Sequence, residues 1–386
     1  MTTKGLAAPP PAPLVEILAA RIAANGPITF AEYMDTALYD PQHGYYTRAA
    51  ATARRDYFTS VDVSGIFGRL IARQLHEMWR RLGAPRDFLL IEAGAGTGAL
   101  ARSILDFIAA QFRDFYEAQR YLAVERSQTL RRAQVAALAR HSAHGKFSSA
   151  AELPESIPAG IILSNEFFDA LPVHRVIGTG DATAPLRELY VGHGANGFFE
   201  ESRPLSNPAL GIYFERHGIK LAPEQQAEVN LKACTWIREA GKRLGRGFVL
   251  TIDYGYEATE LFSERHMRGT MLAYERHRAS ERYFRAPGEQ DLTSHVDFTA
   301  IDRAGQRGGL ARTGYTTQAN FLLQLAHASK MADLEAADLS DGEQAKARNA
   351  FKTLVHPEGM GETFKVLAQH KGIDTPVPQL TGLAPL

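Results

Sequence analysis

Apolar positions along the chain follow two periods, that of a helix and that of a strand. Near the N-terminus, apolar residues from Leu14 to Ile22 recur every three or four positions, which predicts a helix. The following GPITFAEYM predicts a turn and a second short helix, and an apolar stripe from Ile66 to Leu75 predicts another. We therefore expect a helical N-terminal extension over residues 1–80.

From residue 81 onward, short apolar runs alternate with longer amphipathic segments. The runs FLLIEAG, YLAVER, GIILSNEF and GFVLTIDYG predict strands, and the segments 98–112, 128–140 and 223–243 predict helices. Short apolar strands that alternate with helices are typical of a parallel sheet wrapped by helices. The pattern therefore predicts an α/β domain over residues 81–386.

Two insertions, near 173–222 and 256–330, interrupt this alternation. The first contains the alternating runs VHRVIG, LRELYVG and GFFEESRP, which predict antiparallel hairpins, and the second begins with a stretch dense in charge and turns. Both follow predicted strands at their carboxyl ends, where α/β folds place binding loops. At the end of the chain, GMGETFKVLAQHKG predicts a last strand in an antiparallel hairpin at the edge of the sheet.

Charge and composition exclude several kinds of partner. The 386 residues are 45% hydrophobic, enough for a sizeable core, and 43 basic residues balance 43 acidic ones. A chain of zero formal charge has no general field for nucleic acid or an anionic membrane, so we predict no nucleic-acid partner. No apolar run approaches the ~20 residues of a membrane span, and MTTKGLAAPPPAP has neither a signal core nor an Arg-rich targeting pattern, so we expect a cytoplasmic protein without membrane insertion.

The sequence does not favour a metal site. Cys234 is the only cysteine, so it cannot form an internal disulfide or a cysteine cluster. The histidines form no His-Glu-x-x-His motif, and the close pair His141 and His144 has no third ligand nearby. We therefore predict no metal.

A glycine-rich turn follows the first predicted strand of the α/β domain, in LLIEAGAGTGAL. Gly94, Gly96 and Gly98 let the backbone approach a ligand closely, and the helix that follows offers free N–H groups at its N-terminus. The turn satisfies the dinucleotide pattern G-x-G-x-x-G/A, and it equally satisfies the acid-x-G-x-G-x-G turn of S-adenosylmethionine sites. A purely structural turn is the third alternative.

Two acids favour S-adenosylmethionine over a dinucleotide. Glu125 ends the next predicted strand, where a carboxylate can accept the ribose hydroxyl hydrogens, but it lies 31 residues after Gly94 and the dinucleotide pattern prefers roughly 20. Glu92 directly precedes the turn, and its negative charge suits a cationic ligand better than a pyrophosphate. We therefore predict a site for S-adenosylmethionine.

Polar residues also follow the strand GIILSNEF. Asn165, Glu166 and Asp169 lie just beyond its end, beside the crevice that the glycine turn opens, since neighbouring parallel strands end on the same side. Two carboxylates match the fork of donors on a guanidinium and offset its positive charge, although they also suit an amine or hydroxyl nucleophile. The alternative is structural, with Asn165 as a cap and the acids in solvent.

A second polar set lies downstream. TIDYGY places Asp253 and Tyr254 at a strand end, and DLTSHVDF contains Asp291 and His295. A histidine near the site is able to accept a proton as general base, so we add His295 to the candidate catalytic residues. A structural or capping histidine is the alternative.

Together these segments resemble the MidA family, the bacterial and mitochondrial relatives of the arginine methyltransferase that assists assembly of respiratory complex I. The resemblance runs over almost the whole chain, and it is carried by YMDTALYDPQHGYY, DYFTSVDVSGIFG, EAGAGTG, SNEFFDALPVHR, IDYG, GTMLAYERH, DLTSHVDF and QANFLLQL. Many methyltransferases share the glycine turn. The order of DYFTS, NEFFDALP and DLTSHVDF is specific to the family.

The resemblance implies a Rossmann-like class I methyltransferase fold, with a seven-stranded, mostly parallel sheet, a helical N-terminal extension and late insertions. It implies cofactor contacts from Gly94, Gly96, Gly98 and Glu125, with Glu92 beside them, and substrate contacts from Asn165, Glu166 and Asp169. The matching segments also place six residues near the pocket: Tyr45, Tyr46, Thr59, Ser60, His295 and Asp297.

The resemblance also implies a function. The mitochondrial relative makes symmetric dimethylarginine on a quinone-module subunit of complex I, which predicts a protein substrate here. Because no mitochondrial targeting segment is present, we expect a bacterial member whose substrate can differ. A methyltransferase that acts on another nucleophile, and a non-catalytic assembly chaperone, remain alternatives. The oligomeric state stays open, with a homodimer among the options.

Overall fold

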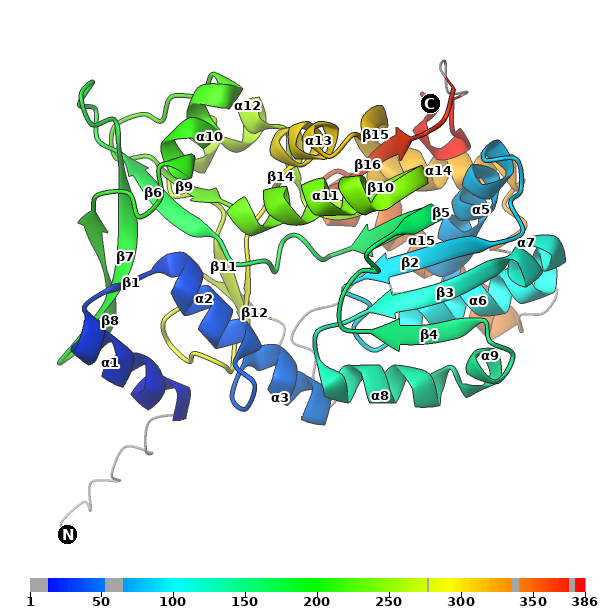
Figure 1. Ribbon diagram of the computed structural model, residues 1–386, viewed down its shortest axis with the longest axis horizontal. Coiled ribbons are helices and arrows are strands. Elements are labelled where there is room, and N and C mark those ends of the chain that lie inside the picture. The colour runs from blue at the N-terminus through cyan, green and yellow to red at the C-terminus, as the bar shows by residue number, and fades with distance from the viewer. Residues whose placement is uncertain (1–12, 53–64, 276–277, 335–339, 375–378, 386) are drawn as a thin grey trace, which may run out of the picture.

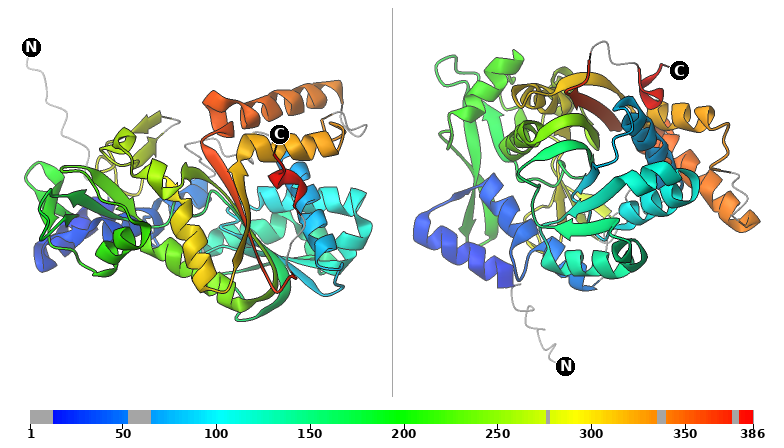
Figure 2. Two further views of the ribbon diagram at one scale, coloured as in Figure 1. Left: turned by 90° about the horizontal axis from the view of Figure 1, so that it is seen from above. Right: turned by 45° about the vertical axis from the view of Figure 1, so that its right-hand side comes forward.

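The protein has a large α/β sheet with its helices and, beside it, a smaller part built on antiparallel strands (Figure 1). The computed structural model describes residues 13–52, 65–275, 278–334, 340–374 and 379–385. Figure 2 shows the same arrangement from above, with helices on both faces of the large sheet. The two parts meet along the edge where the parallel strands end.

The main sheet has the strand order β15-β16-β10-β5-β2-β3-β4, and β14 pairs with β10. Its strands are β2 Phe88–Ala93, β3 Gln119–Val124, β4 Phe147–Ala150, β5 Ile157–Asn165, β10 Leu244–Tyr256, β14 Val296–Asp297, β15 Ala311–Thr317 and β16 Phe364–Lys371. Neighbours from β10 to β4 are parallel, whereas β16 runs antiparallel to both β10 and β15. The predicted α/β sheet is therefore confirmed.

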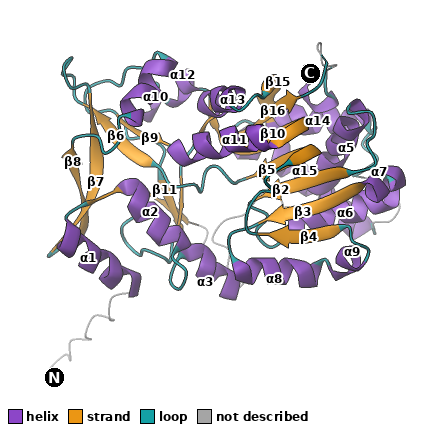
Figure 3. Ribbon diagram, in the orientation of Figure 1, coloured by secondary structure: helices purple, strands orange, loops and turns teal. Residues whose placement is uncertain are grey.

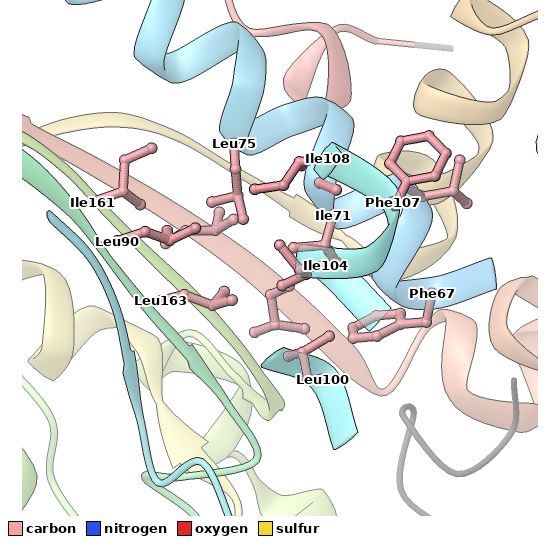
Figure 4. Close-up of a cluster of buried hydrophobic side chains, with 14 of the residues drawn as sticks. Phe67, Ile71, Leu75, Leu90, Leu100, Ile104, Phe107, Ile108, Ile161 and Leu163 are labelled. Atoms are coloured by element: carbon pink, nitrogen blue, oxygen red, sulfur yellow. The ribbon is translucent and has the colours of Figure 1, made fainter. Parts of the chain in front are cut away.

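Side chains of the central strands alternate between two hydrophobic cores, as strand geometry requires. Leu90 and Leu163 face the core formed with α5, α6, α14 and α15, while Ile91 and Ile162 face the core formed with α11 and α13. Figure 4 shows the first core, in which Leu90 and Leu163 meet Ile104 of α6. The helices on this sheet are α5 Gly65–Arg81, α6 Ala99–Gln111, α7 Arg113–Ala118, α8 Gln128–Ala137, α9 Ala139–Ala143, α11 Leu231–Arg243, α13 Phe298–Arg307, α14 Gln318–Ala328 and α15 Asp341–Val355.

The smaller part contains an antiparallel sheet and the first helices of the chain, which lie together in Figure 3. The strands are β1 Ile28–Thr29, β6 His174–Gly178, β7 Leu186–Gly194, β8 Gly197–Arg203 and β9 Gln226–Val229, and a second sheet contains β11 Leu272–Glu275, β12 Arg278–Ser280 and β13 Asp291–Thr293. The helices are α1 Pro13–Asn25, α2 Phe30–Tyr39, α3 Tyr45–Thr52, α10 Ala209–His217 and α12 Ala258–Leu261. The hairpins predicted from the first insertion are therefore confirmed.

The N-terminal helices do not all pack on the same part. Leu18 of α1 and Met34 of α2 share a core with Val191 of the inserted strand β7, whereas Phe67 and Leu75 of α5 pack on the main sheet. Helices α1, α2 and α5 thus contribute to both parts of the molecule. Among the helices within the described ranges, none has the length and apolar character needed to cross a bilayer.

Two predicted elements differ from the structure. The predicted helix 223–243 is helical only from Leu231, because Gln226–Val229 pairs with β6 and the Asn230 side chain caps α11 by accepting from the Ala233 N–H at 2.8 Å. The segment GMGET forms a helical turn and not a strand, and β16 lies inside the sheet because β15 pairs with its outer side. The pairings of β9 with β6 and of β15 with β16 join segments that are distant in the sequence.

Candidate functional site

The glycine turn joins β2 to α6 in a backbone conformation that side chains disfavour. Gly94, Gly96 and Gly98 have φ angles of +70°, +52° and +78°. A Cβ on Gly94 would lie 2.6 Å from Cδ2 of Phe167, so this position also lacks room for a side chain. Gly98 precedes α6 without a side-chain cap, which leaves N–H groups at the helix N-terminus available to a ligand.

The carboxylate of Glu125 is fixed against this turn. It accepts hydrogen bonds from the backbone N–H of Gly96 at 3.1 Å and from that of Ser127 at 2.8 Å. Gln134 of α8 donates to the Gly96 carbonyl at 2.7 Å and so holds the other side of the turn. Burial raises the pKa of Glu125, although its backbone hydrogen bonds oppose that shift. Each carboxylate oxygen retains capacity to accept another hydrogen bond.

Glu92 lies at the end of β2 and is almost completely buried. The Tyr121 hydroxyl donates to its Oε2 at 2.7 Å. Burial nevertheless raises the pKa of Glu92 to about 8, and the nearby charge of Glu125 acts in the same direction. A cation placed next to Glu92 would lower this pKa, because an opposite charge favours the ionised carboxylate.

The turn after β5 has an unusual backbone. Glu166 has a φ of +50°, which is rare for a residue with a side chain. The buried carboxylate of Asp253 on β10 holds the turn, since its Oδ2 accepts from the N–H groups of Phe167 at 3.1 Å and Phe168 at 2.9 Å. Asn165 donates through Nδ2 to Oε1 of Glu166 at 3.1 Å. This geometry fixes the direction of both side chains.

Asp169 lies behind this turn and is fully buried. The Tyr254 hydroxyl donates a hydrogen bond to its Oδ2, while its Oδ1 has no hydrogen-bond partner among the described residues. Burial raises the pKa of Asp169 to about 6. Burial also raises the pKa of Asp253, and the charges of Asp169 and Glu166 add to that shift. The end of β5 is therefore a cluster of carboxylates with perturbed pKa values, which is typical of functional sites.

A cavity of about 1080 Å³ joins the glycine turn to the acidic turn. Eight of the residues selected from the sequence line it: Tyr45, Tyr46, Glu92, Gly94, Gly96, Glu125, Asn165 and Glu166. Gly98 and Asp169 are not in its wall, although each belongs to a turn that is. Thr59 and Ser60 lie outside the described residues.

The structure does not bring His295 to this cavity. The ring of His295 lines a second cavity of about 280 Å³, next to Thr270, and its centroid lies 5.5 Å from that of Tyr254. Burial lowers the pKa of His295 to about 4, and its Nδ1 has no hydrogen-bond partner among the described residues. Asp297 caps α13 and accepts a hydrogen bond from the Tyr213 hydroxyl at 2.6 Å.

Sequence reasoning assigned no role in the site to several other residues of the large cavity, among them Asp291, which it named only as part of a polar segment. Asp291 of β13 lies in its wall and accepts a hydrogen bond from the Tyr46 hydroxyl at 2.9 Å. Tyr39 of α2 and Trp236 of α11 also line it. Asp291 belongs to the same segment as His295, and residue type alone favours the histidine as a base. The register that places Asp291 in the cavity is not visible in the sequence.

The arrangement suits a nucleoside-containing ligand with a positive charge. The carboxylate of Glu125 can receive ribose hydroxyls, the uncapped end of α6 offers N–H donors, and the carboxyl of Glu92 can face a cation. Within the described ranges, no three His, Cys, Asp or Glu side chains are placed to hold a metal ion. These features define a cofactor-binding α/β enzyme with its site at the carboxyl ends of parallel strands.

Comparison with known proteins identifies the cofactor and the family. Residues 70–316 match the family model described as "Putative S-adenosyl-L-methionine-dependent methyltransferase". The chain is 30% identical over 391 residues to the mitochondrial protein arginine methyltransferase NDUFAF7 homolog of Drosophila melanogaster, covering 93% of this chain and 85% of that protein. Human mitochondrial protein arginine methyltransferase NDUFAF7 is 28% identical over 393 residues, with 93% and 83% covered.

A solved structure agrees with these matches. A crystal structure of a Burkholderia thailandensis protein bound to S-adenosyl-homocysteine has a TM-score of 0.84 and 31% identity, and 98% of each chain is covered. The protein is therefore an S-adenosylmethionine-dependent methyltransferase. The chain belongs to the MidA family of these enzymes, as its motifs predicted.

Proposed function

We propose that the protein methylates arginine side chains of a client protein. Two relatives whose sequences align over most of the chain are named as protein arginine methyltransferases. The observation that carries the proposal is the single cavity that contains both the glycine turn and the carboxylate of Glu166. An acidic wall beside a methyl donor suits a cationic substrate, since carboxylates pair with the donor fork of a guanidinium.

The cofactor is held, in this proposal, by Glu92, Gly94, Gly96, Gly98 and Glu125. S-adenosylmethionine supplies a methyl group that its sulfonium charge activates for displacement. Glu125 holds the ribose, the N–H groups around Gly96 approach the chain of the cofactor, and Glu92 faces its ammonium group. The path of seven strands with antiparallel β16 supports a Rossmann-like class I methyltransferase fold, to which β14 adds a short strand.

Asn165 and Glu166 orient the substrate. Asn165 acts through Glu166, because its Nδ2 donates to Oε1 of Glu166 and so holds that carboxylate in place. The Oε atoms of Glu166 pair with the guanidinium and direct one of its nitrogens toward the methyl group. The left-handed backbone at Glu166 sets this direction, which Asp253 enforces through two backbone hydrogen bonds.

Transfer of one methyl group would break the S–C bond of the sulfonium and form an N–C bond, which leaves S-adenosyl-homocysteine and releases one proton from the attacking nitrogen. Glu166, which lines the cavity, takes this proton, and Asp169, buried behind the same turn, is our candidate for the carboxylate that finally holds it. Its pKa of about 6 leaves it ionised at neutral pH yet basic enough to accept a proton. His295 is less suited, because it lines another cavity and burial lowers its pKa to about 4. Catalysis then rests mainly on positioning and charge compensation.

The client and the compartment are further parts of the proposal. Resemblance to the MidA family supports a quinone-module subunit of respiratory complex I as a client, and the single cysteine, Cys234, suits a reducing compartment such as the cytoplasm. Glu166→Gln tests the function. We expect the variant to bind S-adenosyl-homocysteine as the wild type does, measured by calorimetry, and to lose roughly 100-fold in methylarginine formation.

A matched control is Glu155→Gln, an exposed acid outside the cavity wall. It should retain full transfer. Unchanged methylarginine formation in Glu166→Gln would remove Glu166 from the site. A wild-type protein that supports maturation of a complex I subunit, yet never produces methylated protein, would instead favour an assembly chaperone.

A further inference from the structure

The segment 290–294, which contains β13, forms the roof of the large cavity and belongs to the smaller part of the molecule. It contains a carboxylate, that of Asp291, with no assigned role. Asp291 begins β13, pairs in register with Tyr274 of β11, and is fully buried. Its side chain lies in the wall of the cavity that also contains Glu166. Its Oδ1 accepts a hydrogen bond from the Tyr46 hydroxyl of α3 at 2.9 Å, which fixes the carboxylate.

Backbone contacts hold this roof against the acidic turn of the main sheet. The N–H of Ser294, directly after β13, donates to the carbonyl of Asp169 at 3.1 Å. The Tyr39 hydroxyl donates to the carbonyl of Ala170 at 3.0 Å. The Ser294 bond therefore joins the roof to the turn that contains Glu166, and the Tyr39 bond joins α2 to the same turn.

The raised pKa values of two tyrosines indicate that the carboxylates lie close together. Besides burial, the charges of Asp169, Asp291 and Glu166 all raise the pKa of the Tyr274 phenol. Besides burial, the charges of Asp291, Asp169 and the cofactor-side Glu125 raise the pKa of the Tyr39 phenol. The charge of Asp291 thus affects the same two phenols as the charges of the substrate-side acids and of Glu125, so these carboxylates lie near one another.

We propose that Asp291 is a substrate-binding residue that holds the guanidinium of the target arginine together with Glu166, from a different element of the same cavity wall. The inference rests on the proposed function. A guanidinium presents donors along more than one edge of a plane, so two carboxylates from different elements bind it in one orientation. An ammonium is a point charge without such edges, and a pair of carboxylates on separate elements therefore selects arginine over lysine.

The test measures binding to the protein loaded with S-adenosyl-homocysteine. The probes are the acetylated peptide Gly-Gly-Arg-Gly-Gly and the same peptide with lysine in place of arginine. We expect the wild type to prefer the arginine peptide, and Asp291→Asn to bind it about 30-fold more weakly. The affinity of Asp291→Asn for S-adenosyl-homocysteine should remain that of the wild type.

Two further variants separate binding from folding. Tyr46→Phe keeps the ring and removes the donor to Asp291, so we expect a loss of about 3-fold to 10-fold in binding of the arginine peptide. Glu289→Gln is the matched control, since this acid lies two residues before Asp291 and is half exposed in a surface ion pair with Arg48. It should bind the arginine peptide as the wild type does.

The outcomes are distinguishable. If the wild type binds the lysine peptide as well as the arginine peptide, or binds neither, the proposed arginine activity is wrong. If the wild type prefers arginine and Asp291→Asn keeps that affinity, only the role of Asp291 is wrong. A loss of S-adenosyl-homocysteine binding in Asp291→Asn, with Tyr46→Phe unchanged, would make Asp291 a structural residue and overturn the inference.

Discussion

The hydroxyl of Tyr254 on β10 donates a hydrogen bond to the carboxylate of Asp169, behind the acidic turn. This contact lowers the pKa of Asp169, while burial raises it to about 6. The balance matters because an ionised Asp169 is required to accept a proton in the proposed reaction. The hydrogen bond from Tyr254 thus helps to set the pH range over which the enzyme is active.

Tyr254→Phe should move the acidic limb of the kcat profile to higher pH. Removal of the hydrogen bond raises the pKa of Asp169, so a larger fraction is protonated and inactive at pH 6 to 7. We expect a shift of roughly one pH unit, and a loss of about 5-fold in kcat at pH 6 that narrows at pH 8. Tyr256→Phe, two residues further along β10, is the control. An equal shift in both variants, or none in Tyr254→Phe, would exclude the pair as the source.

Cofactor affinity should rise with pH until about pH 8. Glu92 has a pKa of about 8 in the cofactor-free protein and is therefore mostly protonated at neutral pH. A bound ammonium group lowers that pKa, so binding releases a proton below pH 8 and tightens by up to about tenfold per pH unit. Calorimetry with S-adenosyl-homocysteine in buffers of different ionisation enthalpy measures this proton directly.

Glu92→Gln provides the comparison for that measurement. An amide does not titrate, so its affinity for S-adenosyl-homocysteine should be flat between pH 6 and pH 8 and should lie below the wild-type value at pH 8. A wild-type affinity that is also flat over this range, without proton release, would show that Glu92 does not face the cofactor.

Glu125→Gln should weaken cofactor binding by roughly 10-fold to 100-fold. Glutamine retains one acceptor oxygen in place of two, so it cannot accept from both Gly96 and Ser127 while receiving the ribose. The variant should remain folded, since burial of an amide replaces burial of a carboxylate whose pKa is raised. Glu155→Gln should leave the Kd for S-adenosyl-homocysteine unchanged, and a Kd equally unchanged in Glu125→Gln would refute the ribose contact.

Gly94→Ala should abolish cofactor binding through a steric clash. Its Cβ would lie 2.6 Å from the Phe167 ring, in the turn that faces the cavity. Gly145→Ala is a matched control, because Gly145 also has a positive φ, of +65°, but a Cβ at that position would have no atom within 4 Å. Both variants incur backbone strain of about 1 kcal/mol, and only Gly94→Ala should lose S-adenosyl-homocysteine binding. Equal binding by the two would show that the turn tolerates the side chain.

Local signals in the sequence are sufficient for the four central strands of the main sheet and for part of the site. The apolar runs before Gly94, Glu125 and Asn165 indicate buried strands, and parallel strands bring their carboxyl ends to one edge. Residues that directly follow such strands can therefore be assigned to one cavity without knowledge of the full topology. This is why Glu92, Glu125 and Glu166 can be grouped from the sequence.

The remaining features depend on pairings between distant segments. Asp291 reaches the cavity because β13 pairs with β11 and Ser294 bonds to Asp169, more than 120 residues earlier. His295 lies only four residues further, yet it faces another cavity. The helix predicted to begin at residue 223 is wrong over β9, because Gln226–Val229 is too short to show the period of a strand before the Asn230 cap.

The acceptor of the methyl group is tested most directly by radiolabel. The protein is incubated with methyl-labelled S-adenosylmethionine and a cell lysate that contains complex I subunits, and the recovered proteins are hydrolysed in acid and separated as amino acids. We expect label in methylated arginine, and its loss when Glu166→Gln replaces the wild type. Label in lysine or another residue, with none in arginine, would show that the enzyme methylates a different nucleophile.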